Sequence, residues 1–139
     1  MRILLADDSV LILDRLTEIL GIFSQVEIVG SLKNGNETLT ALRTLKPDLA
    51  IIDIRMPGLS GLEVIHEFRK ENSTVKFIIL TLYSSYYHQQ TAMDAGADYF
   101  FNKIDFEKVS LLVAELIADE ENHIPNMPFC IGNDRQQKI

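Results

Sequence analysis

Residues 49–61 read LAIIDIRMPGLSG and indicate the class of fold. The first four residues are all apolar, without the polar alternation of a half-exposed strand. Such a run is typical of a parallel strand that is covered on both faces. Asp53 follows the run, Pro57-Gly58 is a turn signal, and Ser60 with Glu63 fits a capping box at a helix start. The segment therefore predicts a buried strand, a loop and a helix in succession.

The same alternation of strand and helix recurs along the chain. Four further short apolar runs lie at residues 3–6, 26–29, 77–80 and 99–101. Between the runs, apolar residues recur every three or four positions, which predicts amphipathic helices. These residues are Leu39, Leu42, Leu45, Leu62, Ile65, Phe68, Phe106, Val109, Leu112 and Leu116. Five strand–helix units predict an α/β fold with a doubly wound, five-stranded parallel sheet and helices on both faces.

Residues at the predicted boundaries agree with this division. Asn34 with Glu37 is a second cap signal, and Asp105 is expected to cap the last helix. Pro47 is expected to end the second helix, because the residue before a proline is pushed out of the helical region.

The helical pattern stops near Asp119. We therefore predict one folded domain over residues 1–119 and a partly disordered tail over residues 120–139. A tail that docks through Phe129 and Ile131 is the alternative.

The composition fits one domain and excludes several classes of protein. The chain has 139 residues, 20 of them acidic and 13 basic, with a net charge of −7 and one cysteine, Cys130. One cysteine excludes an internal disulfide, and the acidic balance argues against a nucleic-acid-binding face. No apolar run approaches the roughly 20 residues of a membrane span. We expect a cytoplasmic protein without membrane contact or direct nucleic-acid binding.

Polar residues follow four of the five predicted strands. Asp7 and Asp8 follow the first, Asp53 the third and Thr81 the fourth, and the fifth leads to Lys103. Ligands of open parallel sheets bind beyond the carboxyl ends of the strands. We therefore expect these side chains to form one site.

The residue types in this set predict metal-assisted phosphoryl chemistry. Two carboxylates about 4 Å apart repel by roughly 4 kcal/mol at an effective dielectric of about 20, so either one acid is protonated or a cation lies among them. Oxygen ligands suit Mg²⁺ or Mn²⁺. A lysine and a threonine hydroxyl can bind phosphoryl oxygens. The set can support phosphoryl transfer to a carboxylate.

At these residues the sequence resembles the CheY-like receiver domains of bacterial and archaeal two-component response regulators. The matching segments are LADDS at residues 5–9, IDIRMPGLSG at 52–61, LT at 80–81 and AGADYFFNK at 95–103. The resemblance covers Met1 to about Asp119. It implies a flavodoxin-like sheet with strand order 2-1-3-4-5.

The resemblance also implies a role for each site residue. Asp53 would accept a phosphoryl group from a sensor histidine kinase or a phosphotransfer protein. Asp7, Asp8, Asp53 and the backbone carbonyl of Arg55 would hold Mg²⁺ or Mn²⁺. Such a domain is a signalling module that catalyses only its own phosphorylation and dephosphorylation.

The implied switch involves three further residues. Thr81 and Lys103 would contact the phosphoryl group, and Phe100 is the aromatic residue that would turn inward behind Thr81. Output would pass through the fourth helix, fifth strand and fifth helix, to a downstream protein target or a second copy of the chain.

Three positions depart from the family pattern. Phe100 lacks the hydroxyl of the tyrosine that many relatives have. Leu82 stands where a small residue is usual, so we predict that it crowds the phosphoryl pocket and slows both phosphorylation by small acyl phosphates and hydrolysis. Ile104 replaces a proline, so the Lys103–Ile104 peptide bond is expected to be trans.

Several alternatives stay open at this point. The chain is either a stand-alone receiver or the receiver part of a larger regulator, and a degenerate receiver would bind partners without phosphorylation. A phosphohydrolase of the haloacid-dehalogenase type needs a second acid where Arg55 stands. A flavin carrier needs a phosphate-binding loop, which the sequence lacks.

Two groups of ring side chains also need an interpretation. Tyr83, Tyr86 and Tyr87 indicate either ordinary helix packing or a partner-binding patch. His66, His88 and His123 share no metal-ligand spacing, so we expect surface histidines.

Overall fold

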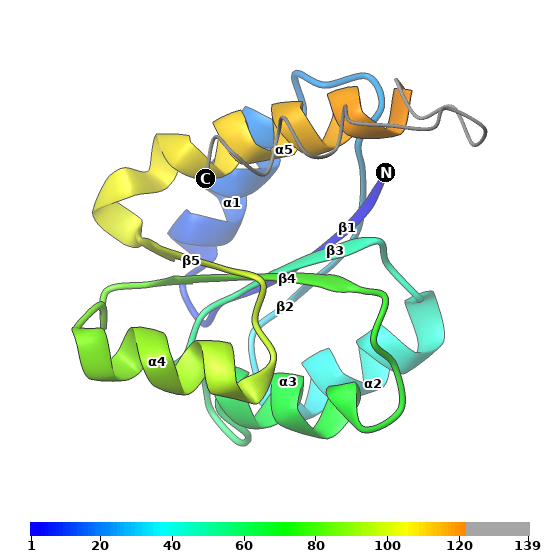
Figure 1. Ribbon diagram of the computed structural model, residues 1–139. Coiled ribbons are helices and arrows are strands. Elements are labelled where there is room, and N and C mark those ends of the chain that lie inside the picture. Colours follow the sequence, from blue (N-terminus) through cyan, green and yellow to red (C-terminus); the bar gives the residue numbers. More distant parts are fainter. Residues whose placement is uncertain (122–139) are drawn as a thin grey trace, which may run out of the picture.

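The computed structural model describes residues 1–121, which form a parallel sheet between two layers of helices (Figure 1). The strands follow the spatial order β2-β1-β3-β4-β5, and all neighbouring pairs are parallel. They are β1 (Arg2–Ala6), β2 (Glu27–Leu32), β3 (Leu49–Ile52), β4 (Lys76–Thr81) and β5 (Tyr99–Asn102). The predicted doubly wound α/β fold and its strand order are confirmed.

The helices divide between the two faces of the sheet. On one face lie α1 (Val10–Leu20) and α5 (Phe106–Glu121), and on the other lie α2 (Gly35–Leu45), α3 (Gly61–Arg69) and α4 (Tyr86–Ala95) (Figure 1). A short 3₁₀ helix, η1 (Lys103–Asp105), precedes α5. Right-handed crossovers between parallel strands produce this division.

Each face of the sheet has its own apolar cluster. Ile3 and Leu5 of β1 pack on the side of α1 and α5, whereas Leu4 and Ala6 pack on the side of α2, α3 and α4. Successive side chains of a strand point to opposite faces, so a strand with two covered faces is apolar throughout. The continuous apolar runs in the sequence reflect this burial.

The predicted helix boundaries rest on the expected contacts in α2 and α3. The Ser60 hydroxyl accepts from the Glu63 N–H at 3.2 Å, and the Glu63 carboxylate accepts from the Ser60 N–H at 2.9 Å. Asn34 accepts from the Glu37 N–H at 2.8 Å. Helix α2 ends at Leu45, two residues before the proline that was expected to end it. Both predicted cap signals are confirmed.

One boundary differs from the prediction, and a short capped helix precedes α5. β2 covers residues 27–32 rather than 26–29, because Gly30, Ser31 and Leu32 pair with the end of β1. Backbone pairing with a central strand outweighs the side-chain pattern there. Asn102 caps the short helix η1, since its side chain accepts from the Ile104 N–H at 2.8 Å. Asp105, which was expected to cap the last helix, is the last residue of η1 and directly precedes α5, and its capping role stays a prediction.

The far end of the chain is described only in part. Helix α5 continues to Glu121, two residues past the predicted domain boundary. Residues 122–139 fall outside the described part, so the predicted tail, its docking alternative and the expectation for His123 stay predictions. Within residues 1–121, no helix combines the length and apolar character needed to cross a bilayer.

Replacing Gly61 with alanine should destabilise the fold. A Cβ at Gly61 would overlap with the Asp53 carbonyl oxygen and crowd the Ile52 side chain. We expect Gly61→Ala to lower the free energy of unfolding by about 1–3 kcal/mol, as measured by urea denaturation. Gly21→Ala is the milder comparison, because Gly21 has a φ of −67° that alanine adopts readily and its nearest Cβ contact would be the Thr17 carbonyl oxygen at 3.0 Å. It should lower the free energy of unfolding by less than Gly61→Ala does. Equal values for the two variants would contradict the close packing of α3 against the end of β3.

Candidate functional site

The register of β1 and β3 brings Asp7 and Asp53 together. Ala6 pairs with Ile52 at the carboxyl ends of these strands, and the Asp53 N–H donates to the Ala6 carbonyl at 3.0 Å. Asp8 follows directly. Carboxylate oxygens of Asp7, Asp8 and Asp53 all lie within 4.8 Å of one another. The predicted acidic cluster is therefore present at the carboxyl edge of the sheet.

Lys103 joins this cluster from the start of η1. Its Nζ lies 2.8 Å from Asp7 Oδ2 and 3.0 Å from Asp53 Oδ2. The side chains of Lys103, Asp7 and Asp53 are only 12%, 3% and 6% exposed. Charges this well buried require close partners, and the single ammonium contacts two of the three carboxylates in the cluster. The site therefore carries excess negative charge that a divalent cation would compensate.

The pKa directions reflect this imbalance. Burial raises the pKa of the Asp7 carboxyl, because its effect exceeds that of the hydrogen bonds from Lys103 and the Ser9 N–H. Burial alone would lower the pKa of the Lys103 ammonium, but the hydrogen bonds to Asp7 and Asp53 raise it above its ordinary value. The lysine is thus held in its charged form, while burial makes the charged form of Asp7 less favourable than it is in water.

Asp53 is held in a fixed orientation by both of its carboxylate oxygens. Oδ1 accepts from the Ile54 N–H at 2.7 Å, and Oδ2 accepts from Lys103. Asp8, by contrast, is exposed. The cluster therefore opens to solvent beside Asp8, while the two buried acids form its floor. An oriented, partly desolvated carboxylate of this kind can act as a nucleophile.

Thr81 ends β4, the strand next to β3, and is fully buried. Its Oγ1 accepts from the Tyr83 N–H at 3.2 Å, which leaves the hydroxyl hydrogen available for another acceptor. Thr81 pairs with Asn102, the residue before Lys103. The sheet register thus places Thr81 and Lys103 at the ends of neighbouring strands.

The remaining predicted residues lie around this centre. Phe100 is partly buried and packs against the apolar cluster beneath α2, α3 and α4. Leu82 is 63% exposed, so its side chain lies at the rim and its effect on access stays a prediction. No cis peptide bond occurs in the described residues, which confirms a trans bond before Ile104. The proposed role of the Arg55 carbonyl also stays a prediction.

The histidines and tyrosines turn out differently from one another. His66 and His88 lie on α3 and α4. Among residues 1–121, the only group of side chains that could together hold a metal ion is the aspartate cluster, which contains no histidine. Tyr86 and Tyr87 are 76% and 73% exposed, so ordinary helix packing was the wrong interpretation for them.

One contact beside the site was not anticipated from the sequence. The Arg55 guanidinium lies over the Tyr83 ring, 4.5 Å from its centroid. Arg55 and Tyr83 belong to different loops, and nothing in the sequence pattern pairs them.

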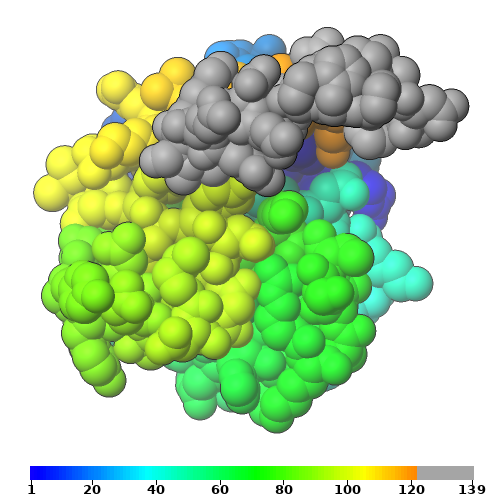
Figure 2. Space-filling model, viewed as in Figure 1, coloured from blue at the N-terminus to red at the C-terminus, as the bar shows by residue number. Residues whose placement is uncertain are grey.

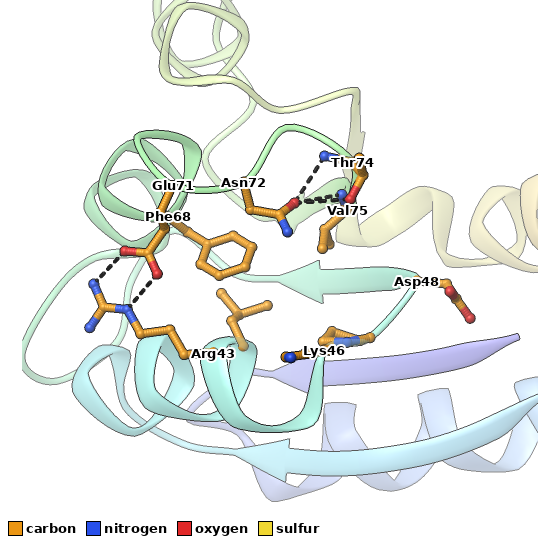
Figure 3. A pocket seen from close by; sticks show the side chains of 10 residues that line it. Arg43, Lys46, Asp48, Phe68, Glu71, Asn72, Thr74 and Val75 are labelled. Carbon is orange, nitrogen blue, oxygen red and sulfur yellow. Dashed lines mark hydrogen bonds and ion pairs between the residues drawn. The ribbon is translucent and has the colours of Figure 1, made fainter.

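A hollow of about 450 Å³ lies at the opposite edge of the sheet (Figure 3). It lies at the carboxyl end of α2, beside the loop between α3 and β4. Arg43 forms two hydrogen bonds with Glu71 at one side, and Asn72 accepts from Thr74 and Val75. Since these polar groups bind one another, the hollow is explained as part of the scaffold.

Comparison with known proteins gives a consistent result. Residues 3–114 match the family described as "Response regulator receiver domain". The chain is 29% identical to "Uncharacterized transcriptional regulatory protein YvfU" of Bacillus subtilis, with 100% of this chain and 73% of that protein covered. It is 31% identical to a protein-glutamate methylesterase/protein-glutamine glutaminase of Halalkalibacterium halodurans, with 88% and 37% covered. It spans about half the length of several other curated relatives.

Solved structures share the fold. The response regulator domain of Thermotoga maritima CheB superposes with a TM-score of 0.75 and 27% identity, covering 90% of this chain and 98% of that one. A CheX-CheY-BeF3-Mg+2 complex from Borrelia burgdorferi gives a TM-score of 0.77 at 22% identity, with 84% and 89% covered.

Replacing Asp7 with asparagine should stabilise the metal-free protein and weaken metal binding. The raised pKa means that the Asp7 carboxyl holds its proton more tightly in the folded chain than in the unfolded chain, so its charge costs free energy on folding. A neutral amide should therefore raise the free energy of unfolding at neutral pH. This gain should shrink as the pH falls toward the ordinary pKa of aspartate, because the wild-type carboxyl then becomes neutral too.

Urea denaturation with and without Mg²⁺ measures both effects. At a Mg²⁺ concentration of about 100 times the dissociation constant, the wild type should gain about 2.7 kcal/mol, and Asp7→Asn should gain much less. An unchanged Mg²⁺ response in the variant would show that Asp7 is not a ligand.

Replacing Leu82 with alanine should open the rim of the site. We expect Leu82→Ala to raise both the rate of phosphorylation by a small acyl phosphate and the rate of phosphate loss, because less apolar volume then stands beside Thr81. Intact-mass time courses measure both rates, with the equally exposed Leu111→Ala on α5 as control. If neither rate rises, Leu82 does not limit access.

Proposed function

Because this chain belongs to the family of response regulator receiver domains, we propose that Asp53 accepts a phosphoryl group with the help of Mg²⁺ or Mn²⁺. Receiver domains are phosphorylatable switches of two-component signalling. The observation that carries the assignment to Asp53 is the arrangement of Asp7, Asp8 and Lys103 around its carboxylate.

The residues of the site fit the proposed reaction step by step. An oxygen of Asp53 attacks the phosphorus of a phosphohistidine. The phosphorus–nitrogen bond breaks and its electron pair stays on the histidine nitrogen. Lys103 and the Thr81 hydroxyl bind oxygens of the transferred group. Asp7, Asp8, Asp53 and the Arg55 carbonyl would hold the cation, whose charge offsets that of the phosphoryl oxygens.

The proposed output follows from the way α4 is attached. Ala92 is the only buried residue of α4, and α4 lies beside α3 on the face seen in Figure 2. Phe100 of β5 packs on the α4 side of the sheet. We propose that bonding of Thr81 to the phosphoryl group repositions Phe100 and the weakly anchored α4. The α4-β5-α5 surface would then bind a downstream protein or a second copy of the chain.

The proposed phosphodonor is a cytoplasmic sensor histidine kinase or a phosphotransfer protein. Methylesterase activity is not carried over from the relative of that name, since the chain covers 37% of it. DNA binding is likewise not carried over from EvgA of Escherichia coli, of which 50% is covered. A degenerate receiver is disfavoured because the charged groups of the site lie close together. Carboxylate oxygens of Asp7, Asp8 and Asp53 lie within 4.8 Å of one another, and Lys103 Nζ lies 3.0 Å from Asp53 Oδ2.

Phosphorylation at Asp53 can be tested directly. The protein is incubated with Mg²⁺ and either a small acyl phosphate or a histidine kinase of broad specificity, and its intact mass is measured. We expect the mass of one phosphoryl group to be added to the wild type and none to Asp53→Asn. Asp94→Asn, an exposed acid on α4, is the matched control and should be phosphorylated like the wild type.

Two outcomes would contradict the proposal. Phosphorylation of Asp53→Asn to the wild-type extent would place the acceptor elsewhere. No added mass on the wild type with a kinase that phosphorylates another receiver would favour a degenerate receiver.

A further inference from the structure

A groove runs between α3 and α4, which lie side by side on the face seen in Figure 2. Its volume is about 470 Å³, within the range of roughly 300–1,000 Å³ that is usual for binding sites. Glu63 and Glu67 line it one turn apart on α3, and Thr91 and Ala95 line it one turn apart on α4. The groove therefore follows the two helices along their length. It uses the flank of α4 that faces α3, and its lining includes no residue of β5 or α5.

The floor of the groove is apolar. Leu59 and Leu62 are partly buried and pack against the apolar cluster beneath α2, α3 and α4, and Ala95 lines the groove from α4. Helix α4 itself buries only Ala92, so most of its surface is available for contact with another molecule. An elongated apolar groove between two helices fits the apolar face of a third helix.

Acidic side chains flank this floor on both sides. Glu63 and Glu67 stand on α3 and Asp94 stands on α4, and none of the described residues that line the groove is a lysine or an arginine. The hollow in Figure 3, by contrast, is lined by side chains of both signs, with Arg43 bonded to Glu71. The uniform negative charge thus distinguishes the α3–α4 groove from a hollow that belongs to the scaffold.

The acids at the rim are accessible to cations from another molecule. Asp94 is exposed and forms no ion pair within residues 1–121. Glu67 lies 3.2 Å from the Lys70 ammonium, but the two side chains are 45% and 61% exposed. An ion pair this exposed contributes little to stability, so a cation from a partner can join or replace Lys70 there.

We propose that the α3–α4 groove binds a cationic amphipathic helix of a partner protein. The apolar face of that helix would lie on Leu59, Leu62 and Ala95, and its lysine or arginine side chains would meet the acids on both rims. The charge of the groove favours a basic partner over a second copy of this chain, whose net charge is −7. The inference goes beyond the proposed phosphorylation of Asp53 and does not depend on it.

Binding can be measured with a defined probe and the unphosphorylated protein. The probe is a fluorescein-labelled synthetic peptide of leucine and lysine, about 15 residues long so that it can form a helix, with the leucines on one face. Fluorescence anisotropy is followed as protein is added, and we expect saturable binding. Two comparison peptides should bind at least about tenfold more weakly. One has glutamate in place of lysine, which reverses the charge, and the other has glutamine in place of leucine, which removes the apolar face.

Charge-reversed variants locate the binding on the protein. Glu67→Lys and Asp94→Lys should each weaken binding of the leucine–lysine peptide about three- to tenfold, because an attraction at the rim becomes a repulsion. Glu115→Lys is the matched control, since Glu115 is exposed on α5 outside the groove and its reversal changes the net charge by the same amount. At physiological ionic strength it should change the dissociation constant by less than about twofold, because distant exposed charges are screened.

Four results would overturn the inference. They are no binding of the leucine–lysine peptide, equally tight binding of the glutamate peptide, equally tight binding of the glutamine peptide, and equal dissociation constants for Glu67→Lys, Asp94→Lys and Glu115→Lys. Asp53→Asn should bind the probe like the wild type, because Asp53 does not line the groove. Failure of the groove therefore leaves the proposed function of Asp53 intact, and failure of phosphorylation leaves the groove intact.

Discussion

The bridge from Lys103 to Asp7 and Asp53 is the interaction on which the site depends. Two carboxylates are almost fully buried here, at the ends of adjacent strands. Burying an unpaired charge is strongly unfavourable, and breaking a buried pair costs about 3–5 kcal/mol. One ammonium in contact with both acids makes their burial possible. Because Asp8 adds a third carboxylate, the pairing is incomplete, and this incompleteness is what suits the site to a cation.

The scaffold gives this bridge a rigid floor and a looser rim. β1, β3 and β4 are buried on both faces almost throughout, so the strand ends that carry Asp7, Asp53 and Thr81 have little freedom. Burial decreases toward the edge strand β5, whose residues are all partly exposed, and then to α4, which buries one side chain. Low local burial is where a fold opens most readily. We therefore expect a change at the rigid floor to be felt most at α4 and β5.

Local sequence patterns predicted the parts of the structure that depend on neighbours in the chain. The apolar runs, the capping box at Ser60 and the cluster at the strand ends follow from periodicity, capping chemistry and the geometry of parallel sheets. The strand order came from the resemblance to receiver domains, not from periodicity. The true extent of β2 depends on its pairing with β1, and the Arg55–Tyr83 contact depends on two loops that meet only in the folded chain. No periodic pattern in the sequence predicts contacts between segments that are distant in the chain.

Most of the buried polar residues belong to the site, so it is the site that departs from the rule that a protein core is apolar. Four polar or charged residues are buried in the described chain: Asp7, Thr38, Asp53 and Thr81. Thr38 has an ordinary structural role, since its hydroxyl donates to the Asn34 carbonyl within α2. The other three all lie at the carboxyl ends of β1, β3 and β4. A sequence selected for stability alone would place apolar side chains at such positions, because a charged group there needs a partner to be tolerated. Their concentration at one edge of an otherwise apolar core is best explained by chemistry, and the raised pKa of Asp7 is a direct physical consequence of that arrangement.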